Sequence, residues 1–362
     1  MAIPNSNTTT TFRPGRKRFL SKKSLERYLP RPVFTLIYKG VLASQTVKTG
    51  FTLGHNYVND LTRFLRWSHK GRQDRHAAQT EYAILKQYHG IEKGLSLKEP
   101  RPGFGQEKIK DLLVRIDTYE KDPAHKPAVV KAAIGSLLDY RTFNRTHDVS
   151  QLWLDRWLEA RSSQQIEHAE RDGGVEHVTR AAILEKTAGV TENFFMSRHS
   201  IRNFSGGEVP FDDIERAANI ARKTPSVCNR QGPRSHCFMN ASKALKLQSG
   251  NAGFGHQASR ALVITSDIQA YSSVGERHQA YIDGGLYAMS IVYALHALGY
   301  GSCMLAWNQT MQKNAKARTK LGIPDNEVII MMIAVGTLPD ELVVANAYRR
   351  PVSSSLFVHP DE

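Results

Sequence analysis

The first half of the chain carries apolar residues at the spacing of amphipathic helices. In "QEKIKDLLVRIDTYEK" (106–121), four of them occur at i, i+3, i+4 and i+7, so they share one face of a helix. These four positions are Ile109, Leu112, Leu113 and Ile116. "KGLSLKEPRPGFG" (93–105) interrupts the helical pattern with two Pro and three Gly, which predicts an ordered loop. Residues 19–185 are therefore predicted to be mostly helical.

The second half has a different pattern, in which short apolar runs rich in β-branched residues predict buried strands. "ALVITSD" (261–267) and "VIIMMIAVG" (328–336) are of this kind, each with Asp or Gly at its end. Between them, "DGGLYAMSIVYALHALG" (283–299) is helical but apolar on nearly every face, which predicts burial all round. Either the centre of a domain or a dimer interface would provide such burial. The second half is thus predicted to be α+β.

A polar segment separates the two halves. "RSSQQIEHAERDGGVEHVTR" (161–180) contains a Gly-Gly pair and few apolar residues, as a boundary between structural regions does. We therefore expect a flexible basic tail over residues 1–18, a mostly helical N-terminal region over 19–185 and an α+β domain over 186–362.

The composition is that of a globular protein without a membrane span. Hydrophobic residues make up 41% of the 362 residues and charged residues 23%. No apolar run approaches the roughly 20 residues that a spanning helix needs. The N-terminal basic residues are not followed by the apolar core of a secretory signal. Three scattered cysteines are too few for a disulfide framework or a zinc site, so we expect a cytoplasmic protein without a metal site.

The net charge of +15 is concentrated at the N-terminal end. Residues 1–72 hold 14 Lys and Arg against 2 Asp and Glu. This basic arm has three possible partners: nucleic acid, an anionic membrane surface or acidic polymer, and the acidic face of a protein. Because the sequence contains no known nucleic-acid-binding motif, nucleic acid is the least favoured of the three.

A short cationic stretch in the second half has the donor groups that an anion binds. In "SRHSIRNF" (197–204), Arg198 and Arg202 are four residues apart, so one helical turn would point both guanidinium groups the same way. Ser200 lies between them and adds a hydroxyl. Two Arg and a hydroxyl form the donor set for a phosphate monoester. A solvated basic helix end has the same pattern.

A second stretch, "TPSVCNRQGPR" (224–234), forms a polar loop after a predicted helix. Pro225 stops that helix, and the loop then offers Ser226, Asn229 and Gln231 as hydrogen-bonding groups for a heterocycle or a polyol. The alternative interpretation is an ordinary capping turn.

Two further stretches follow the apolar helix. In "ALGYGSCMLAWNQ" (297–309), two Gly end the helix, and the next residues form either a core strand or a backbone edge that faces a flat ligand. In "AVGTLPDELVVANAYRRPV" (334–352), a buried strand ends at Gly336, and a loop then carries Arg349 and Arg350. The alternative for this loop is a basic surface tail.

Together, in this order, the four stretches resemble the FMN-dependent nitroreductase family. The resemblance covers about residues 186–362, roughly half of the chain. It implies an FMN-binding α+β fold with a mainly antiparallel central sheet flanked by helices, here preceded by the helical N-terminal region. It also implies a homodimer with the flavin site at the interface, which is consistent with the apolar helix 283–299.

The resemblance implies roles for particular residues. Arg198, Ser200 and Arg202 correspond to ligands of the FMN phosphate and ribityl chain, and His199 stands where the family has Arg or His. The loop that lies against the isoalloxazine and ribityl corresponds to Pro225, Ser226, Val227 and Asn229. Leu305 and Ala306 correspond to the backbone amides near flavin N5 and O4, and Arg349, with Arg350 as a substitute, to the C-terminal phosphate-binding Arg. Ala347 stands where some family members have a Lys.

The implied activity is that of an FMN-dependent oxidoreductase. NAD(P)H passes hydride to flavin N5 and leaves, and a small-molecule acceptor then uses the same face, which gives ping-pong turnover. This scheme needs no catalytic side chain. The alternative is a fold-retaining binding or assembly component that uses the basic N-terminal region to bind an anionic surface, a polymer or a protein partner.

The N-terminal region contains one more stretch with candidate functional residues. "YHGIEKGLSLKEPRPGFG" (88–105) resembles extensions of nitroreductase-like proteins linked to polysaccharide biosynthesis. His89, Glu92 and Lys93 would then be placed to form a lid or substrate pocket over the flavin. The alternative is a helix end and a structural loop packed on the body of the protein.

Overall fold

The computed structural model of the chain describes residues 31–68, 77–161, 166, 172–345 and 347–359. By its internal contacts the chain divides into two compact units, Met1–Val58 and Asn59–Glu362. The helical region from Asn59 onward is therefore in the same unit as the C-terminal half. The predicted tail and the rest of the basic arm up to residue 30 lie outside the described residues. Their binding to an anionic surface, polymer or partner stays a prediction, as do the domain boundaries drawn from the sequence.

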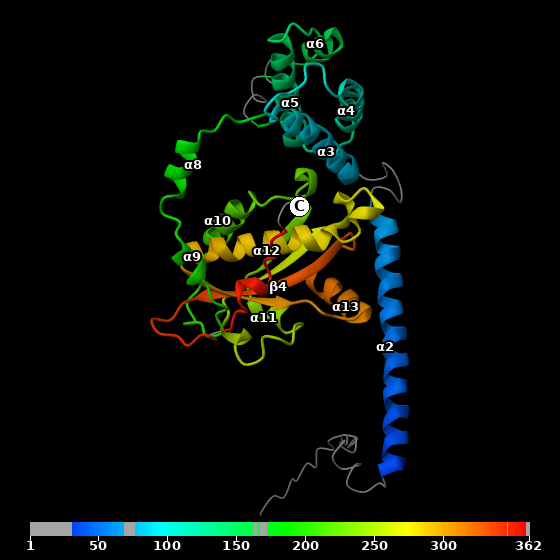
Figure 1. Ribbon diagram of the computed structural model, residues 1–362, viewed down its shortest axis with the longest axis vertical. Helices are drawn as coiled ribbons and strands as arrows, with labels where there is room; N and C mark the ends of the chain where they lie inside the picture. Colours follow the sequence, from blue (N-terminus) through cyan, green and yellow to red (C-terminus); the bar gives the residue numbers. More distant parts are fainter. Residues whose placement is uncertain (1–30, 69–76, 162–165, 167–171, 346, 360–362) are drawn as a thin grey trace, which may run out of the picture. The chain divides into compact units, whose positions relative to one another are not determined.

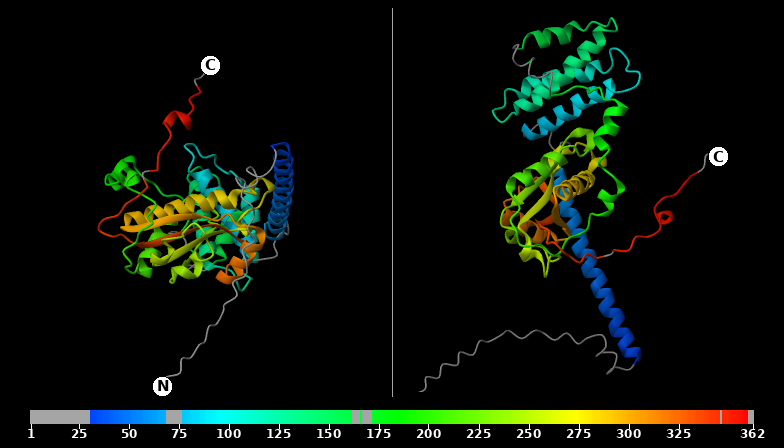
Figure 2. Two further views of the ribbon diagram at one scale, coloured as in Figure 1. Left: turned by 90° about the horizontal axis from the view of Figure 1, so that it is seen from below. Right: turned by 90° about the vertical axis from the view of Figure 1, so that its left-hand side faces the viewer.

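The described chain before the sheet is helical (Figures 1 and 2). Its helices are α2 (Arg31–Trp67), α3 (Ala77–Leu95), α4 (Gln106–Tyr119), α5 (Pro127–Arg145), α6 (Leu152–Glu159), α8 (Arg180–Thr187) and α9 (Glu192–Met196). The four apolar residues predicted to share a face of α4 are all buried. The predicted loop follows α3, which itself continues through Leu95. Hydrophobic periodicity therefore identified the helices and the buried face of α4.

A four-stranded antiparallel sheet forms the core of the C-terminal half. Its strands are β1 (Pro233–Phe238), β2 (Arg260–Asp267), β3 (Tyr300–Ala306) and β4 (Glu327–Thr337), in the order β1-β2-β4-β3. The two strands predicted as apolar runs are the central strands β2 and β4, and every residue of β2 is buried. The expected α+β class, an antiparallel sheet flanked by helices after a helical region, is confirmed.

Helices cover both faces of this sheet. α10 (Phe211–Ala221) and α12 (Gln279–Ala297) lie on one face, and α11 (Ala241–Leu245) and α13 (Met311–Leu321) on the other (Figure 1). Short 3-10 turns occur at Val227–Asn229 (η1), Gly255–Gln257 (η2), Ile268–Ala270 (η3), Val274–Glu276 (η4) and Val352–Ser354 (η5). Side chains alternate across β2 as a strand requires: Leu262 and Ile264 pack under α10 and α12, whereas Ala261 and Val263 pack on the other face.

Within one chain α12 is buried on one side only, so the centre of a domain is wrong as the environment of this helix, and the dimer interface stays a prediction. Ala288, Ile291 and Leu295 are fully buried against the sheet and its neighbouring helices. On the outer side, Ile282 is 54% exposed and Leu286 is 48% exposed. Of the two environments proposed for this helix, a dimer interface remains the one that would cover its outer apolar face.

The apolar core continues from the helical region into the end of the sheet. It joins buried residues of α3, α4, α5 and α6 to Ile268, Tyr271 and Val328, which flank β2 and begin β4. A shared core of this kind packs the helical region directly against the end of the sheet.

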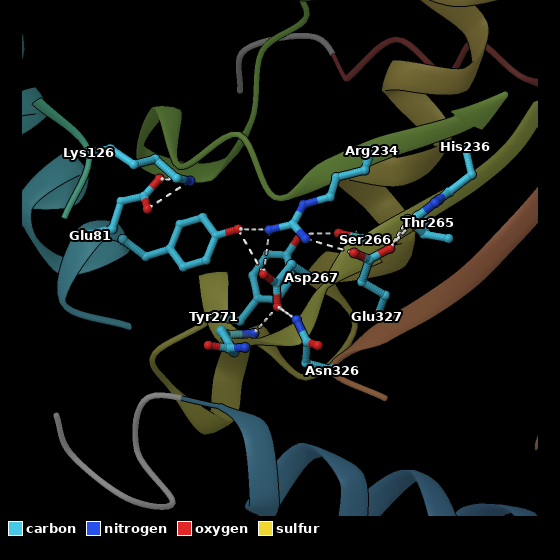
Figure 3. A network of polar contacts seen from close by, with 12 residues as sticks. Glu81, Lys126, Arg234, His236, Thr265, Ser266, Asp267, Tyr271, Asn326 and Glu327 are labelled. Atoms are coloured by element: carbon cyan, nitrogen blue, oxygen red, sulfur yellow. Dashed lines mark hydrogen bonds and ion pairs between the residues drawn. The ribbon is translucent and has the colours of Figure 1, made fainter. Parts of the chain in front are cut away.

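A buried polar network reinforces the same junction (Figure 3). Arg234 on β1 donates from Nη2 to Asp267 Oδ2 and from Nη1 to Glu327 Oε1, both at 2.7 Å. Tyr82 of α3 donates to the same Asp267 oxygen at 3.0 Å. The carboxylate side chains of Asp267 and Glu327 are each 1% exposed, so their hydrogen bonds replace water almost completely. The network therefore fixes α3 onto the edge of β1 and β2.

We expect Glu327→Gln to lower the free energy of unfolding at pH 7 by about 2–3 kcal/mol, the scale of lost charged hydrogen bonds. Burial alone would raise the pKa of Glu327, but hydrogen bonds from His236 and Thr265 and the charge of Arg234 lower it to about 2. A carboxylate with a depressed pKa stabilises the fold above its unfolded pKa of about 4.3 and loses that contribution as the pH falls toward the folded value. The variant lacks this titration, so urea unfolding should show the difference from wild type shrinking between about pH 4.5 and pH 2.5. An unchanged difference across that range would contradict the assignment.

Candidate functional site

The stretch "SRHSIRNF" follows α9 and runs along the edge of the sheet. Residues 198–204 form no helix, so the helical turn predicted from the spacing of the two arginines is wrong. Ile201 N donates to Ser302 O of β3 at 2.9 Å, and Ser205 N donates to Thr337 O at the end of β4 at 3.0 Å. Ile201 and Phe204 are 7% and 5% exposed. The segment is extended along the sheet because its two apolar residues enter the core beneath it.

Two glycines make this close approach possible. A Cβ on Gly336 would lie 2.6 Å from the ring of Phe204, and a Cβ on Gly301 would lie 3.0 Å from the side chain of Ile201. Any larger residue at Gly336 would push the cationic segment off the sheet. Gly301 and Gly336 belong to the third and fourth of the predicted stretches, so three of the four stretches meet at this corner of the fold.

A cavity of about 200 Å³ opens beside the cationic segment. Its polar lining comes from the segment itself, from the end of α12 and from β3: Ser197, Arg198, His199, His296, Tyr300 and Ser302. The fourth stretch closes it with Leu338, Leu342 and Val344. α9 lies beside the C-terminal end of α12 (Figure 1), and the hydroxyl of Ser197 is 2.9 Å from His296 Nε2. The cavity is therefore built by elements that the core holds in place.

Positive charge gathers at this cavity. Burial lowers the pKa of His296, and the nearby charges of Arg198 and His199 lower it further. Burial raises the pKa of the Cys303 thiol, while Arg202 and Arg198 act on it in the opposite direction. Among the described residues, no ion pair joins Arg198, Arg202 or His199 to an Asp or Glu. A cluster of cations without carboxylate partners is suited to an external anion.

The second predicted stretch is a constrained loop. Val227 N donates to Asp283 Oδ2 at 3.2 Å, and Gln231 N donates to Ser226 Oγ at 2.9 Å. Cys228 and Asn229 both have φ of 49°, in the left-handed region that non-glycine residues rarely adopt. Pro225 is exposed, and the next four residues are half-buried. Such strained backbone persists only where surrounding contacts hold it, and it occurs frequently at ligand sites.

Arg230 anchors this loop from beneath. Its guanidinium, 1% exposed, donates from Nε to Val227 O at 3.1 Å and from Nη2 to Glu276 Oε1 at 2.7 Å. Burial alone would raise the pKa of Glu276, but hydrogen bonds from Arg230 and from Ser272 N lower it to about 2. Sequence reasoning missed Arg230, Glu276 and Asp283 as supports of the loop. The one usable signal was Asp283, a carboxylate at the start of an otherwise apolar helix.

Within a single chain, the two main candidate FMN-binding segments, the cationic segment and the loop of Pro225–Asn229, lie far apart. Asp283, near the start of α12, holds the loop of Pro225–Asn229, whereas His296, near the end of α12, lines the cationic cavity. The 13 residue steps from 283 to 296 correspond to about 20 Å of helix. Arg198 and Asn229 are therefore not partners within one chain.

The other candidates are dispersed as well. Leu305 and Ala306 end β3, about 10 Å and about 13 Å along the strand from Ser302. Leu305 is buried, and Ala306 O accepts a hydrogen bond from Gln248 Nε2 at 2.9 Å. Arg349 and Arg350 are exposed and do not line the cationic cavity. Of the predicted residues, Arg198 and His199 thus line the cavity. Ser200 and Arg202 belong to the same segment but are not among the lining residues, and the remaining candidates lie elsewhere on the chain.

The contacts of the "YHGIEKGL" helix end favour its structural interpretation. Glu92 accepts hydrogen bonds from Ser136 Oγ at 3.1 Å and from Gly174 N at 3.3 Å, and His89 Nδ1 lies 3.2 Å from its other oxygen. These partners all belong to the helical region, where Glu92 joins α3 to α5.

In the described part of the chain, no group of three or more His, Cys, Asp and Glu is placed to hold a metal ion. None of the helices described is both long and apolar enough to cross a membrane.

Residues 233–337 match the model of the Nitroreductase family. This range contains all four strands of the sheet together with α11, α12 and α13. The nitroreductase resemblance is therefore supported for the sheet and its helices, over a shorter range than the 186–362 expected from the motifs. The comparisons give no support to the predicted link between the N-terminal extension and polysaccharide biosynthesis.

Individual proteins show the same similarity. A protein of Archaeoglobus fulgidus whose name refers to NADH dehydrogenase and NAD(P)H nitroreductase is 28% identical over 151 residues, 40% of this chain and 83% of that protein. An FMN-dependent nitroreductase structure from Clostridium difficile is 21% identical, with a TM-score of 0.40, over 47% of this chain and 99% of that one. A nitroreductase structure with FMN from Desulfovibrio desulfuricans is 19% identical, with a TM-score of 0.41, over 47% and 97%.

Proposed function

We propose that the protein is an FMN-dependent oxidoreductase that takes electrons from NAD(P)H and passes them to a small-molecule acceptor in ping-pong turnover. The observation that carries the proposal is the cavity lined by Arg198 and His199, beside Arg202 of the same segment, on a sheet that matches the Nitroreductase family. Among the described residues, none of these three side chains pairs with a carboxylate. The name of the Archaeoglobus fulgidus relative supports NAD(P)H as the electron donor.

The donor groups of the cationic segment beside the cavity fit the phosphate of FMN. Two guanidinium groups and the hydroxyl of Ser200 are the charge-assisted donors that a phosphate monoester requires. A volume of about 200 Å³ holds about seven water molecules, enough for the phosphate and part of the ribityl chain. FMN, when bound, supplies the two-electron redox chemistry. The roles left to this chain are to hold the phosphate at Arg198 and Arg202 and to keep water away from the buried side of the cavity.

The rest of the flavin site requires a second copy of the chain. The loop of Pro225–Asn229 lies about 20 Å from the cavity along α12 of the same chain. A homodimer formed through the outer face of α12 would bring the loop of one protomer toward the cavity of the other. The C-terminal segment offers more apolar surface for that interface, with Val343 96%, Phe357 71% and Val358 81% exposed. We therefore propose a homodimer with two shared flavin sites.

Arg198→Ala is expected to weaken FMN binding by about 10- to 150-fold, the loss of one charge-assisted contact of about 1.5–3 kcal/mol. Arg156, an exposed arginine on α6, provides the matched control, because Arg156→Ala removes the same group far from the cavity. Fluorescence titration of flavin-free protein with FMN measures both variants and the wild type.

The proposal also predicts the colour and redox behaviour of the purified protein. It should be yellow, release FMN on denaturation and bleach when NADH or NADPH is added without oxygen. A colourless protein that takes up no FMN on reconstitution would rule out the proposed function. An Arg198→Ala variant with wild-type affinity would show instead that the phosphate binds elsewhere.

A further inference from the structure

The long helix α2 carries a stripe of exposed apolar side chains. Val47, Phe51, Val58, Leu61 and Leu65 are each more than half exposed. They recur at steps of four, seven, three and four residues, so they fall within a sector of about 80° around the helix. The apolar stripe, defined by these five residues, is about 27 Å long on one unbroken helix (Figure 1).

The last turns of α2 are attached to the fold through their other side. Arg63 donates from Nη2 to Asp325 O and to Glu327 O, both at 2.8 Å. Phe64 packs against the apolar core of the helical region. Residues two positions apart lie about 200° apart around a helix, and both positions two away from Arg63 belong to the apolar stripe. The stripe therefore faces away from the side by which the helix is attached.

The charges of α2 are complementary to an anionic surface on the side of the stripe. Lys39 and Lys48 are exposed and lie on its two opposite borders, each about 80–100° from its centre. Lysines in such positions lay their methylene stems along apolar surface while the ammonium group reaches outward. Asp60, the single acidic residue in the sequence of α2, lines a small cavity with Arg63 on the attached side. Positive charge thus borders the apolar stripe, and negative charge does not.

A second copy of α2 suits this stripe less well than lipid does. Gly54 falls within the same sector, between Phe51 and Val58, where the seam of a coiled coil requires a large side chain. Two copies would also bring their lysines together without acidic residues on the stripe side to pair with them. Acyl chains fill an uneven apolar surface, and phospholipid headgroups supply the anions.

We propose that α2 binds the surface of an anionic phospholipid bilayer. The apolar stripe lies at the boundary between headgroups and acyl chains, and Lys39 and Lys48 reach the headgroup phosphates on either side of it. The helix therefore lies along the membrane plane. The stripe includes none of the predicted flavin-binding residues, so this role goes beyond the proposed oxidoreductase activity and would hold that activity at a membrane surface.

Flotation of the full-length protein with phospholipid vesicles tests the proposal. One set of vesicles is phosphatidylcholine alone, and the other is phosphatidylcholine and phosphatidylglycerol in equal parts. We expect binding to the anionic vesicles at least about tenfold tighter than to the neutral ones, because two lysines meet headgroup charge, and weaker binding at high salt. The fraction of protein that floats is measured without reference to flavin, so failure here leaves the proposed function standing.

Variants of α2 separate the apolar contribution from the charge. Phe51→Ser should weaken binding to anionic vesicles about tenfold or more, and Val58→Ser about fivefold, because each removes apolar area from the stripe. Val114→Ser is the matched control, since it makes the same change at an exposed valine of α4. Lys48→Gln should weaken binding about fivefold at low salt, whereas Lys98→Gln, at an exposed lysine after α3, should bind as the wild type does.

The double variant Phe51→Ser/Val58→Ser provides the decisive comparison, because both side chains are exposed and their loss leaves the core intact. Wild-type vesicle binding by this variant, or equal binding of the wild type to neutral and anionic vesicles, would overturn the proposal. A smaller oligomer of the double variant in gel filtration, with unchanged vesicle binding, would also overturn it and assign the stripe to a second copy of the chain.

Discussion

An Arg230→Ala chain is expected to unfold with a free energy about 3–5 kcal/mol below that of the wild type, because the change leaves Glu276 without its partner. The guanidinium is 1% exposed and also donates to two backbone carbonyl oxygens, Val227 O and Ala270 O. Alanine leaves these acceptors unpaired and opens a void below the loop. Urea or thermal unfolding at pH 7 measures the loss, and Arg222→Ala, an exposed arginine eight positions earlier, is the control that should change little.

The pH dependence of the free energy of unfolding separates the loss of the Arg230 charge from the loss of its side-chain volume. With Arg230 in place, the depressed pKa of Glu276, about 2, makes the ionised form stabilising above its unfolded pKa of about 4.3. That contribution disappears as the pH falls from about 4.5 toward 2. Arg230→Met keeps much of the volume but lacks the charge, so its deficit should shrink over this range. The double variant Arg230→Met/Glu276→Gln should recover stability relative to Arg230→Met alone, and a double variant that is less stable would contradict the proposed coupling.

The sequence predicts the strands that are buried on both faces, because such strands consist mainly of apolar residues. β2 and β4 are central strands covered on both faces, so they are continuous apolar runs. β1 has no such signal, because its arginine and histidine, Arg234 and His236, serve the polar network of the junction. Their carboxylate partner Glu327 is 93 and 91 residues away, and only the pairing of β2 with β4 brings it close.

In the candidate site, too, the sequence predicts some features and not others. The cations of "SRHSIRNF" are recognisable because the stretch holds two arginines and a serine and no Asp or Glu. The arrangement of these cations is not recognisable from the sequence. Their four-residue spacing predicts a helical turn, but burial of Ile201 and Phe204 holds the segment extended along the sheet. The anchoring of the loop by Arg230 and Asp283 depends on contacts across 46 and 56 residues. Residue types therefore predict which groups bind, and tertiary packing determines which of them meet.

The distance along α12 predicts that two differently damaged chains restore one flavin site when they form a mixed dimer. Arg198→Ala/Arg202→Ala should bind FMN about 100- to 20,000-fold more weakly than the wild type, by the loss of two charge-assisted contacts. Ser226→Glu should disable the other half of the site, since it places a larger, anionic side chain on the half-buried loop. Each variant alone should elute from gel filtration without flavin.

Co-expression of the two variants with different affinity tags allows the mixed dimer to be purified by successive capture. One of its sites combines both damaged segments, and the other combines the intact cations of one protomer with the intact loop of its partner. The mixed dimer should therefore carry one FMN, where the wild-type dimer carries two. If the cations and the loop instead acted within one chain, both sites of the mixed dimer would be damaged and it would stay colourless. The ratio of flavin absorbance to protein thus decides between a site shared by two copies and a site contained in one.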